Sequence, residues 1–274
     1  MTNIDILTFG TGYGEKIYER FIGTLKASGF IGTLYIIILD SDKHKLDKIS
    51  KHNPTMNIIA ISINMKNIAT HINNYRFLVM RNILETKIIS PNAPYIFICD
   101  LRDVLFQKNI HDFIFDENVD IFGFQEGILI KDDQQYNSRW IKMLETILKE
   151  DIYTHIKNNY VICCGTTLIK NNYLLKYLTF MTNIICDNNI TDNLDQEIHN
   201  YMLYFNKLNC NIRILTNIDN FVNTVGNDQK KLIDNQIVNV NNDVSYIVHQ
   251  YDRLSKSQKN FLAVKYNHKY DFSI

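Results

Sequence analysis

The sequence is poor in cysteine, proline and tryptophan, and each scarcity narrows the kind of protein it can be. Its 274 residues include five cysteines, three prolines and one tryptophan. The number of cysteines is odd and their spacing is unpaired, which argues against a disulfide framework. They are Cys99, Cys163, Cys164, Cys186 and Cys210. We therefore expect buried, reduced thiols, as is usual in cytosolic proteins.

The chain also lacks net charge and a long apolar run, and its first residues do not have the pattern of a leader sequence. It has 29 basic and 29 acidic residues, so its overall charge attracts neither nucleic acid nor an anionic membrane. No stretch of about 18 apolar residues occurs, which predicts no membrane-spanning helix. The start, MTNIDILTFGTGYGEK, has no basic segment ahead of an apolar run. We therefore expect no signal peptide and a cytoplasmic location.

What the chain does contain is a series of apolar segments that alternate with helical patterns. A hydrophobic share of 46% is sufficient for a substantial core, and no linker divides the chain. The spacing predicts strands at 4–10, 33–42, 53–64, 93–100, 119–126, 160–169, 212–216 and 245–250. It predicts helices at 15–30, 71–88, 138–150, 172–185 and 193–208. This indicates one α/β domain with a mostly parallel central sheet, helices on both faces and an irregular C-terminal part.

One apolar strand ends on a cluster of charges. In YIFICDLRDVLFQKN, residues 95–109, Asp100 and Asp103 flank Arg102. Ligand sites of open α/β sheets lie beyond the carboxyl ends of the strands, and charged groups are costly to desolvate without a partner. The two carboxylates suit a shared Mg²⁺ or Mn²⁺ ion, because these ions prefer oxygen ligands. An ion pair with Arg102 that only fixes the turn is the alternative.

Three later segments carry further candidate groups. YVICCGTTLIK is a strand that breaks at Gly165, which indicates either close approach of a ligand or a β-bulge. DNLDQEIHNYM places Asp195 at the start of a helix, where it either caps the helix or belongs to a functional site. Gln196 and Asn200 follow within about one turn, and capping does not explain them. SYIVHQYDR ends a strand at His249, which is either a structural histidine or a ligand.

Taken in order, these motifs resemble the nucleotide-sugar glycosyltransferases of the GT-A fold. The likeness is to glycogenin-like members and to relatives from eukaryotes and large viruses. FIGTLKASGFIGTLYIIIL resembles the first helix and second strand of that family, and DLRDVLFQKNI is similar to its variant motif D-x-R-D-V-x-F-Q. YNSRWI is similar to a segment between the motifs. The resemblance extends from about residue 4 to about residue 253.

The resemblance implies a fold, a reaction and its partners. It implies a single GT-A domain over 1–274, with a nucleotide-binding half at 1–110 and an acceptor and sugar half at 111–274. The implied reaction transfers a sugar from a nucleoside-diphosphate sugar, expected to be a UDP-sugar, to a hydroxyl group of a protein or glycan acceptor. A homodimer is compatible with the resemblance, and a viral origin would place the enzyme in the host cytoplasm.

Roles for individual residues follow from the same resemblance. The expected ligands of Mn²⁺ or Mg²⁺ and of the donor's diphosphate are Asp100, Asp103 and His249. The residues expected beside the nucleotide base are Phe9, Gly10 and Thr11. Those expected under the donor sugar are Gly165 and Thr166, and those beside the transferred sugar and the acceptor are Asp195 and Gln196. Asp195 is expected nearest the anomeric carbon, as base, nucleophile or electrostatic stabiliser.

One position departs from the family's usual Asp-x-Asp metal motif, since Arg102 stands two residues after Asp100. Either Asp103 replaces the second acid with a shifted turn, or Arg102 neutralises the diphosphate and the metal is weaker or absent. The second option is chemically sound because a guanidinium binds phosphate through two hydrogen bonds. The sequence leaves both open.

Three other functions share parts of the pattern. FGTGYGEK resembles a dinucleotide-binding loop and Asp40 ends the next strand, but the third glycine position is Glu15. An NAD-dependent oxidoreductase would explain this loop and none of the later motifs. FICDLRDVLF faintly resembles the haloacid-dehalogenase phosphatases, whose second Asp is Arg102 here. Arg102 and the Cys163–Cys164 pair also fit a glycosyltransferase-like binding module without activity.

Overall fold

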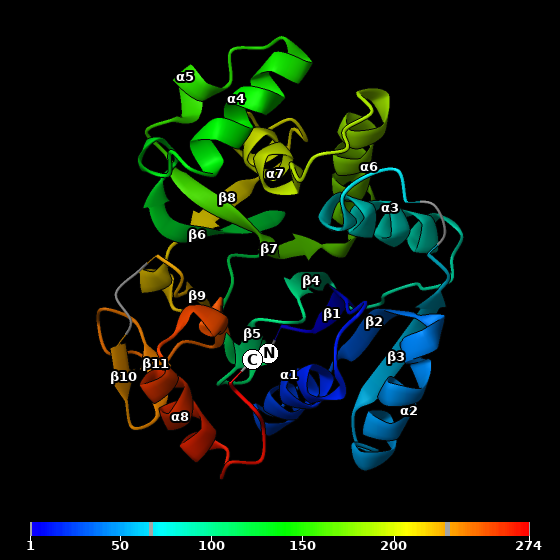
Figure 1. The fold of residues 1–274 in the computed structure, drawn as a ribbon, viewed down its shortest axis with the longest axis vertical. Coiled ribbons are helices and arrows are strands. Elements are labelled where there is room, and N and C mark those ends of the chain that lie inside the picture. Colours follow the sequence, from blue (N-terminus) through cyan, green and yellow to red (C-terminus); the bar gives the residue numbers. More distant parts are fainter. Residues whose placement is uncertain (1, 66–67, 228–230, 274) are drawn as a thin grey trace.

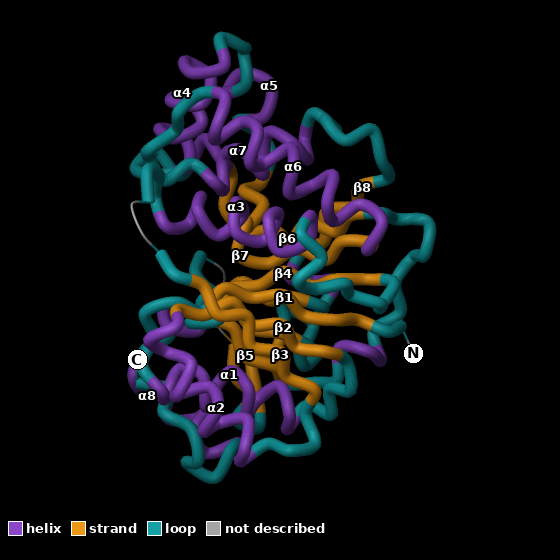
Figure 2. The backbone as a smooth tube through the Cα atoms, turned by 90° about the vertical axis from the view of Figure 1, so that its right-hand side faces the viewer, coloured by secondary structure: helices purple, strands orange, loops and turns teal. Residues whose placement is uncertain are grey.

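The fold is built on a seven-stranded sheet whose strands run mostly parallel, as the sequence predicts. The structure is a computed structural model that describes residues 2–65, 68–227 and 231–273. The strand order across the sheet is β3-β2-β1-β4-β7-β6-β8, and Figure 2 shows these strands stacked through the middle of the molecule. The strands are β1 (Ile4–Phe9), β2 (Thr33–Leu39), β3 (Asn57–Ile63), β4 (Tyr95–Asp100), β6 (Ile121–Leu129), β7 (Tyr160–Lys170) and β8 (Ile212–Leu215).

Strand β7 is the exception to the parallel arrangement, because it runs antiparallel to both neighbours, β4 and β6. Between β6 and β7 the chain forms α4 (Asn137–Leu148) and α5 (Tyr153–Ile156) and then returns from the end at which β6 stopped. A connection that returns at the same end produces an antiparallel pair. The apolar pattern of β7 shows that the strand is buried on both faces but does not reveal its direction.

Helices cover both faces of the sheet, which confirms the predicted fold class (Figure 1). One face packs against α1 (Glu15–Ala27) and α2 (Lys43–His52), and the other against α3 (Ile72–Glu85), α4, α6 (Asn171–Asp187) and α7 (Asp195–Tyr204). Successive side chains of a strand point to opposite faces of the sheet and so pack into different hydrophobic cores. In β4, Ile96 and Ile98 pack on the α3 side, whereas Phe97 and Cys99 pack on the α1 side.

A second, three-stranded sheet joins the middle of the chain to its C-terminal part. It has the order β5-β12-β9, with β5 (Val104–Phe106), β9 (Val222–Thr224) and β12 (Ile247–His249). The C-terminal part predicted as irregular thus contains regular elements. It also holds the hairpin of β10 (Lys231–Ile233) and β11 (Gln236–Val238) and helix α8 (Lys256–Lys265). Short 3-10 helices are η1 (Asp40–Asp42), η2 (Ile110–Asp112), η3 (Ile130–Asp132), η4 (Asn217–Asp219) and η5 (Tyr251–Arg253).

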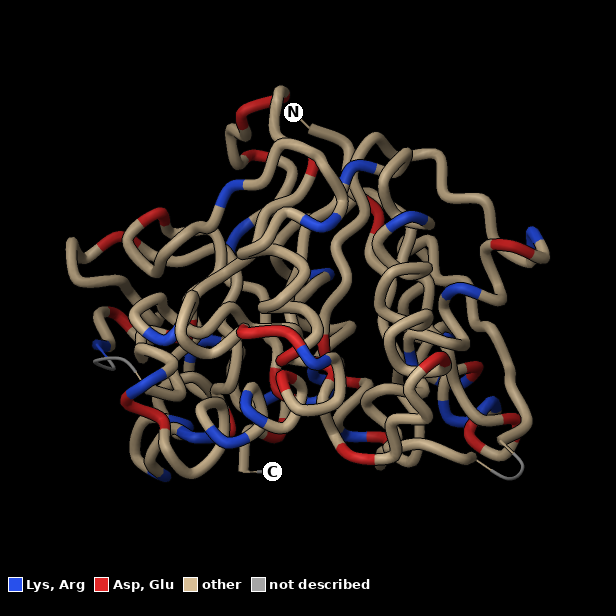
Figure 3. The backbone as a smooth tube through the Cα atoms, turned by 90° about the horizontal axis from the view of Figure 1, so that it is seen from above, with Lys and Arg blue, Asp and Glu red and all other residues tan. Residues whose placement is uncertain are grey.

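The surface and the cysteines agree largely with the sequence expectations. Lysine and arginine lie among aspartate and glutamate around the whole molecule (Figure 3), as the zero net charge suggests. Within the described residues, no helix combines the length and the apolar character needed to cross a membrane. All five cysteines are free, but only Cys99, Cys163 and Cys164 are buried. The expectation of a buried thiol is wrong for Cys186, which is exposed near the end of α6, and Cys210 is half-buried.

Candidate active site

Three ligand groups meet at the carboxyl edge of the large sheet. Asp100 ends β4, the chain turns, and Asp103 precedes β5. Strand β12 pairs antiparallel with β5 and places His249 opposite Val104, so the late histidine arrives beside the turn. Its Nε2 lies 3.8 Å from Asp100 Oδ2 and 3.6 Å from Asp103 Oδ1. One ligand atom from each of these three residues lies within 4.8 Å of the other two.

The ionisation of this cluster reflects crowding of two carboxylates around one imidazole. Burial alone would raise the pKa of Asp100, but Arg76 and His249 lower it to about 2. Burial raises the pKa of Asp103 above its ordinary value, and the neighbouring Asp100 adds to the rise. Burial alone would lower the pKa of His249, but Asp103 and Asp100 raise it. The cluster therefore attracts positive charge, which a proton on His249 or a divalent cation supplies.

The donor set fits a hard divalent cation. Two carboxylates and one imidazole are ligands that Mn²⁺ accepts readily. Gly165 leaves the space in front of them, since a Cβ there would lie 2.5 Å from Asp100 Oδ2 and 3.0 Å from His249 Cε1. Strand β7 continues through Gly165, so the predicted break is wrong. The register of β7 against β6 does shift between Ile162 and Thr167, which places Gly165 in an irregular stretch beside the cluster.

Arg76, which the sequence analysis missed, ties two of the predicted acids together. It extends from α3, with Nη1 donating to Asp100 Oδ1 and Nη2 donating to Asp195 Oδ2 at 2.6 Å. Its side chain is only 12% exposed, so the guanidinium and both carboxylates form a largely desolvated ion-pair network. A lone arginine in an amphipathic helix gives no sequence signal that separates this position from a solvent-exposed one.

Helix α7 supplies the next group of polar side chains. Leu194 is the residue before the helix and Asp195 is its first residue, so Asp195 pairs with Arg76 instead of capping the helix. Gln196 bridges two elements, accepting from Cys164 N at 3.4 Å and donating to Asn137 Oδ1 at 2.9 Å. Asn200 exchanges two hydrogen bonds of 2.8 Å with the backbone of Ile162, so its role is to dock α7 on β7.

These groups surround a cavity of about 590 Å³. Six of the residues expected from the sequence line it, namely Asp100, Asp103, Gly165, Asp195, Gln196 and His249. Further lining residues that the sequence analysis missed include Arg76, Glu126, Asp133, Trp140, Glu197 and Gln250. The cavity thus lies where the β4 edge, the α7 start and the β12 end converge.

The expected nucleotide-base residues lie next to this cavity and not in its wall. Phe9 pairs with Asp100 in the register of β1 and β4, and Gly10 N donates to Ile37 O at 2.8 Å. Thr11 follows in the loop before α1. Tyr13 of the same loop is close enough to the turn that Asp100 and Asp103 contribute to its raised pKa, after burial.

Arg102 and Thr166 also lie outside the cavity wall. Thr166 is fully buried and pairs with Cys99 between β7 and β4. The Arg102 side chain is 52% exposed, and its Nη2 donates to Asp252 Oδ2 at 2.6 Å. The backbone carbonyl of Arg102 accepts two hydrogen bonds, one from Arg20 Nη2 at 2.7 Å and one from Tyr251 Oη at 2.9 Å. Arg20 is completely buried, so these bonds fix the turn that carries Asp100 and Asp103.

Comparison with known proteins identifies the fold. No protein-family model and no curated protein matches the sequence. The chain is similar in structure to the galactosyltransferase LgtC in complex with donor and acceptor sugar analogues, with a TM-score of 0.60 and 13% identity over 96% of this chain and 95% of that chain. An active-site glutamine-to-glutamate mutant of LgtC gives a TM-score of 0.61 and 12% identity over the same shares. The glycosyltransferase GlyE of Streptococcus pneumoniae TIGR4 gives 0.56 and 11%, over 100% of this chain and 62% of that chain. These likenesses confirm the predicted GT-A fold.

Proposed function

We propose that this protein is a glycosyltransferase that transfers a sugar from a nucleoside-diphosphate sugar, a UDP-sugar, to a hydroxyl group of a protein or glycan. The observation that carries the proposal is the cluster of Asp100, Asp103 and His249 at the carboxyl edge of a GT-A sheet. Ligands of open α/β sheets bind at this edge. The proposed reaction takes place in the cytoplasm, and in that of the host if the protein is viral.

The donor's nucleotide and diphosphate are assigned to the first half of the chain, 1–110. We assign the base to the loop of Phe9, Gly10 and Thr11, because the register of β1 and β4 places Phe9 beside Asp100. Mn²⁺ or Mg²⁺ at the cluster would neutralise the charge that grows on the leaving diphosphate. Asp100 remains ionised at every relevant pH, since Arg76 and His249 lower its pKa to about 2 despite burial.

The transferred sugar is assigned to the cavity wall formed by Gly165, Asp195 and Gln196, with Thr166 behind it in β7. In the transfer, the acceptor oxygen bonds to the anomeric carbon and the anomeric C–O bond breaks, leaving its electron pair on the diphosphate. The hydroxyl proton passes to a basic oxygen of the site. We propose Asp195, held by Arg76, as the negative charge beside the electron-poor anomeric carbon. The active-site glutamine of LgtC gives Gln196 a precedent.

The direct test is a screen of sugar nucleotides with and without Mn²⁺. A donor that binds the folded state raises the melting temperature by mass action. Release of nucleoside diphosphate from that donor, alone and with a broad acceptor panel, then measures turnover. Binding without turnover on any acceptor would identify an inactive binding module, and tight NAD binding with no response to sugar nucleotides would contradict the proposal.

The role of the metal is tested separately by chelation. EDTA is expected to abolish turnover, because it removes the divalent cation that is proposed to neutralise the diphosphate. Added Mn²⁺ is expected to restore turnover. Arg102→Ala serves as the comparison, and we expect a smaller loss because Arg102 is half-exposed and paired with Asp252. Full turnover in EDTA together with a severe loss in Arg102→Ala would assign the diphosphate to Arg102.

A further inference from the structure

Several buried polar atoms in the wall of the 590 Å³ cavity have no partner within the protein. Four of them are acceptors, namely both carboxyl oxygens of Glu197, Oδ1 of Asn193 and Oε1 of Gln250. Unpaired buried acceptors are costly, so their presence in one wall indicates a ligand that brings donors. Asp195, two residues before Glu197, has no such need because Arg76 donates to it.

Glu197 is the ionisable residue among the three that carry these unpaired acceptors. It lies in the first turn of α7, is 1% exposed, and has no hydrogen-bond partner in another residue for either oxygen. Burial, followed by the nearby Asp195, Glu126 and Asp133, raises the pKa of Glu197 well above its ordinary value. A carboxyl group in this position gains most from a positively charged partner that replaces its proton.

The charge of the wall favours such a partner. Six acidic side chains of the described residues line the cavity, namely Asp100, Asp103, Glu126, Asp133, Asp195 and Glu197. Among the described residues, the lysine and arginine side chains in this wall are Arg76 and Arg253 alone. Arg76 is committed to Asp100 and Asp195, and Arg253 acts electrostatically on Glu126, whereas neither arginine is hydrogen-bonded to Glu197. Even a divalent cation at the Asp100 cluster leaves this end acidic.

An aromatic pair lines the same cavity. The ring centroids of Tyr136 and Trp140 are 5.4 Å apart. Tyr136 is 47% exposed, so part of its side chain is accessible to a ligand. Aromatic faces bind both the apolar faces of sugar rings and cationic groups.

We propose that the acceptor of the transfer carries a protonated amine, as an amino sugar does, and that Glu197 binds this ammonium group. The inference rests on the proposed glycosyl transfer and names the class of its acceptor. An ammonium group offers three donors and no acceptor, which matches the unpaired oxygens of Glu197. Tyr136 and Trp140 then lie where the sugar ring packs.

The test compares methyl glycosides that differ at one position: glucosamine, N-acetylglucosamine and glucose. With the donor found in the screen, we expect kcat/KM for the amine at least about ten-fold above both neutral glycosides, since losing one partner of a buried charge pair costs at least that factor. Glu197→Gln, which keeps the shape of the side chain, should bring this ratio close to one. Glu150→Gln is the matched control, because Glu150 lies outside the cavity and pairs with Tyr201 and Lys207.

Binding without donor separates this inference from the proposed function. Saturation-transfer NMR should show the amine glycoside binding the wild type selectively, and the selectivity should disappear in Glu197→Gln. Donor turnover with no preference for the amine, or a preference unchanged in Glu197→Gln, would overturn the acceptor assignment and leave glycosyl transfer standing. Selective amine binding in a protein that neither binds nor turns over any sugar nucleotide would overturn the transferase and leave the ammonium subsite.

Discussion

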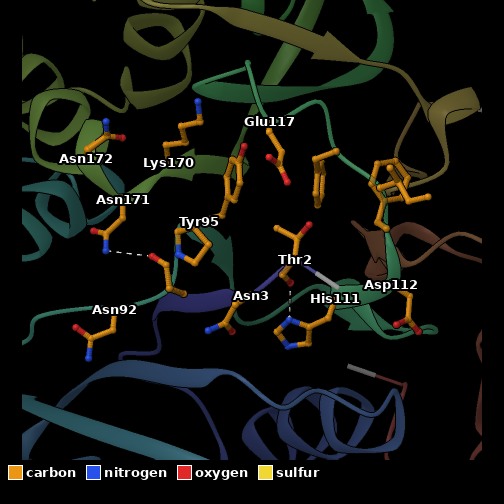
Figure 4. Close-up of a pocket in the computed structure, with 15 residues that line it drawn as sticks. Thr2, Asn3, Asn92, Tyr95, His111, Asp112, Glu117, Lys170, Asn171 and Asn172 are labelled. Carbon is orange, nitrogen blue, oxygen red and sulfur yellow. Dashed lines mark hydrogen bonds between the residues drawn. The ribbon is translucent and has the colours of Figure 1, made fainter.

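Two cavities lie at opposite ends of the strands of the central sheet, and they differ in how well the polar groups in their walls are hydrogen-bonded. The larger, of about 1080 Å³, is lined by residues at the amino ends of β1 and β4, including Thr2, Tyr95 and His111 (Figure 4). Among the residues that the structure describes, none that line it has a buried side-chain nitrogen or oxygen without a hydrogen-bond partner. His111 contacts Thr2 O at 2.9 Å and accepts from Ile31 N, and Asn171 donates to Pro91 O and Ala93 O.

The smaller cavity, of about 590 Å³, has buried polar groups in its wall that lack hydrogen-bond partners. Asp100 and Asp103 share one imidazole, and the carboxyl group of Glu197 has no hydrogen-bond partner in another residue. Burying groups in this way lowers stability, and such cost is tolerated at functional sites. The comparison favours the smaller cavity as the proposed site because of its unpaired polar groups and in spite of its smaller volume. It predicts that changes in the small cavity alter activity and that equivalent changes in the large one do not.

The largest effect is expected from removing Asp103. Asp103→Ala takes away one of the two carboxylates proposed to hold the diphosphate end of the donor, and such a charge-stabilising group typically contributes about 100-fold to turnover. The measurement is donor hydrolysis and transfer at saturating Mn²⁺. Asp112, which lines the large cavity, provides the control, and Asp112→Ala should retain activity. Full activity in Asp103→Ala would refute the assigned site.

A smaller loss is expected from filling the space at Gly165. In Gly165→Ala the new Cβ would lie 2.5 Å from Asp100 Oδ2, so the carboxylate must move. Displacing a positioned group by about 1 Å costs ten-fold or more in rate. Gly14→Ala is the matched variant, since no atom lies within 4 Å of its added Cβ. Equal turnover of Gly165→Ala and wild type would show that the cluster does not need this space.

A pH effect on stability should separate two of the buried histidines, His249 in the small cavity and His111 in the large one. The pKa of His249 is raised above its ordinary value, so its ion pairs with Asp103 and Asp100 stabilise the folded state at low pH. In EDTA this stabilisation is complete below the unfolded pKa of about 6.5 and is lost as pH rises through the folded pKa. Thermal melts of wild type and His249→Asn should therefore differ most below the unfolded pKa and converge as the pH rises through the raised pKa of His249 in the folded state.

The corresponding variant in the large cavity, His111→Asn, checks that this effect belongs to the acidic cluster. The Nδ1 of His111 contacts the Thr2 carbonyl instead of a carboxylate, so its contribution carries no ion pair to lose. A pH-dependent gap of the same size in both variants would contradict the assignment.

The fold was predictable from the sequence because its strands are continuous apolar segments of strand length. The segment at 95–100 and the helix at 71–88 needed no tertiary information. The direction of β7 was not predictable, because it depends on where the chain returns after α5. The short strands β5 and β9 carry too few residues for a pattern, and they form through pairing with β12.

The site was predictable to a different extent. Asp100, Asp103, Asp195 and His249 stand in motifs whose order suggests a function, and the structure brings them together. Arg76 belongs to no motif, and only the packing of α3 against β4 and α7 reveals its two carboxylate partners. Glu197 is adjacent to a motif, but its lack of partners is a property of the folded state. The sequence therefore does not reveal how deeply these side chains are buried or which residues they pair with.

The smallest effect is expected from a charge change in the large cavity. Glu117 lines it and is exposed, so Glu117→Gln removes a charge that water already solvates (Figure 4). Donor turnover and the preference among the three glycosides should stay within about two-fold of wild type, as for surface substitutions in general. The same chemical change at Glu197 should remove the amine preference, because there the carboxyl is buried and unpaired. A loss of transfer in Glu117→Gln would mean that the large cavity also binds a substrate, and volume would then have been the better guide.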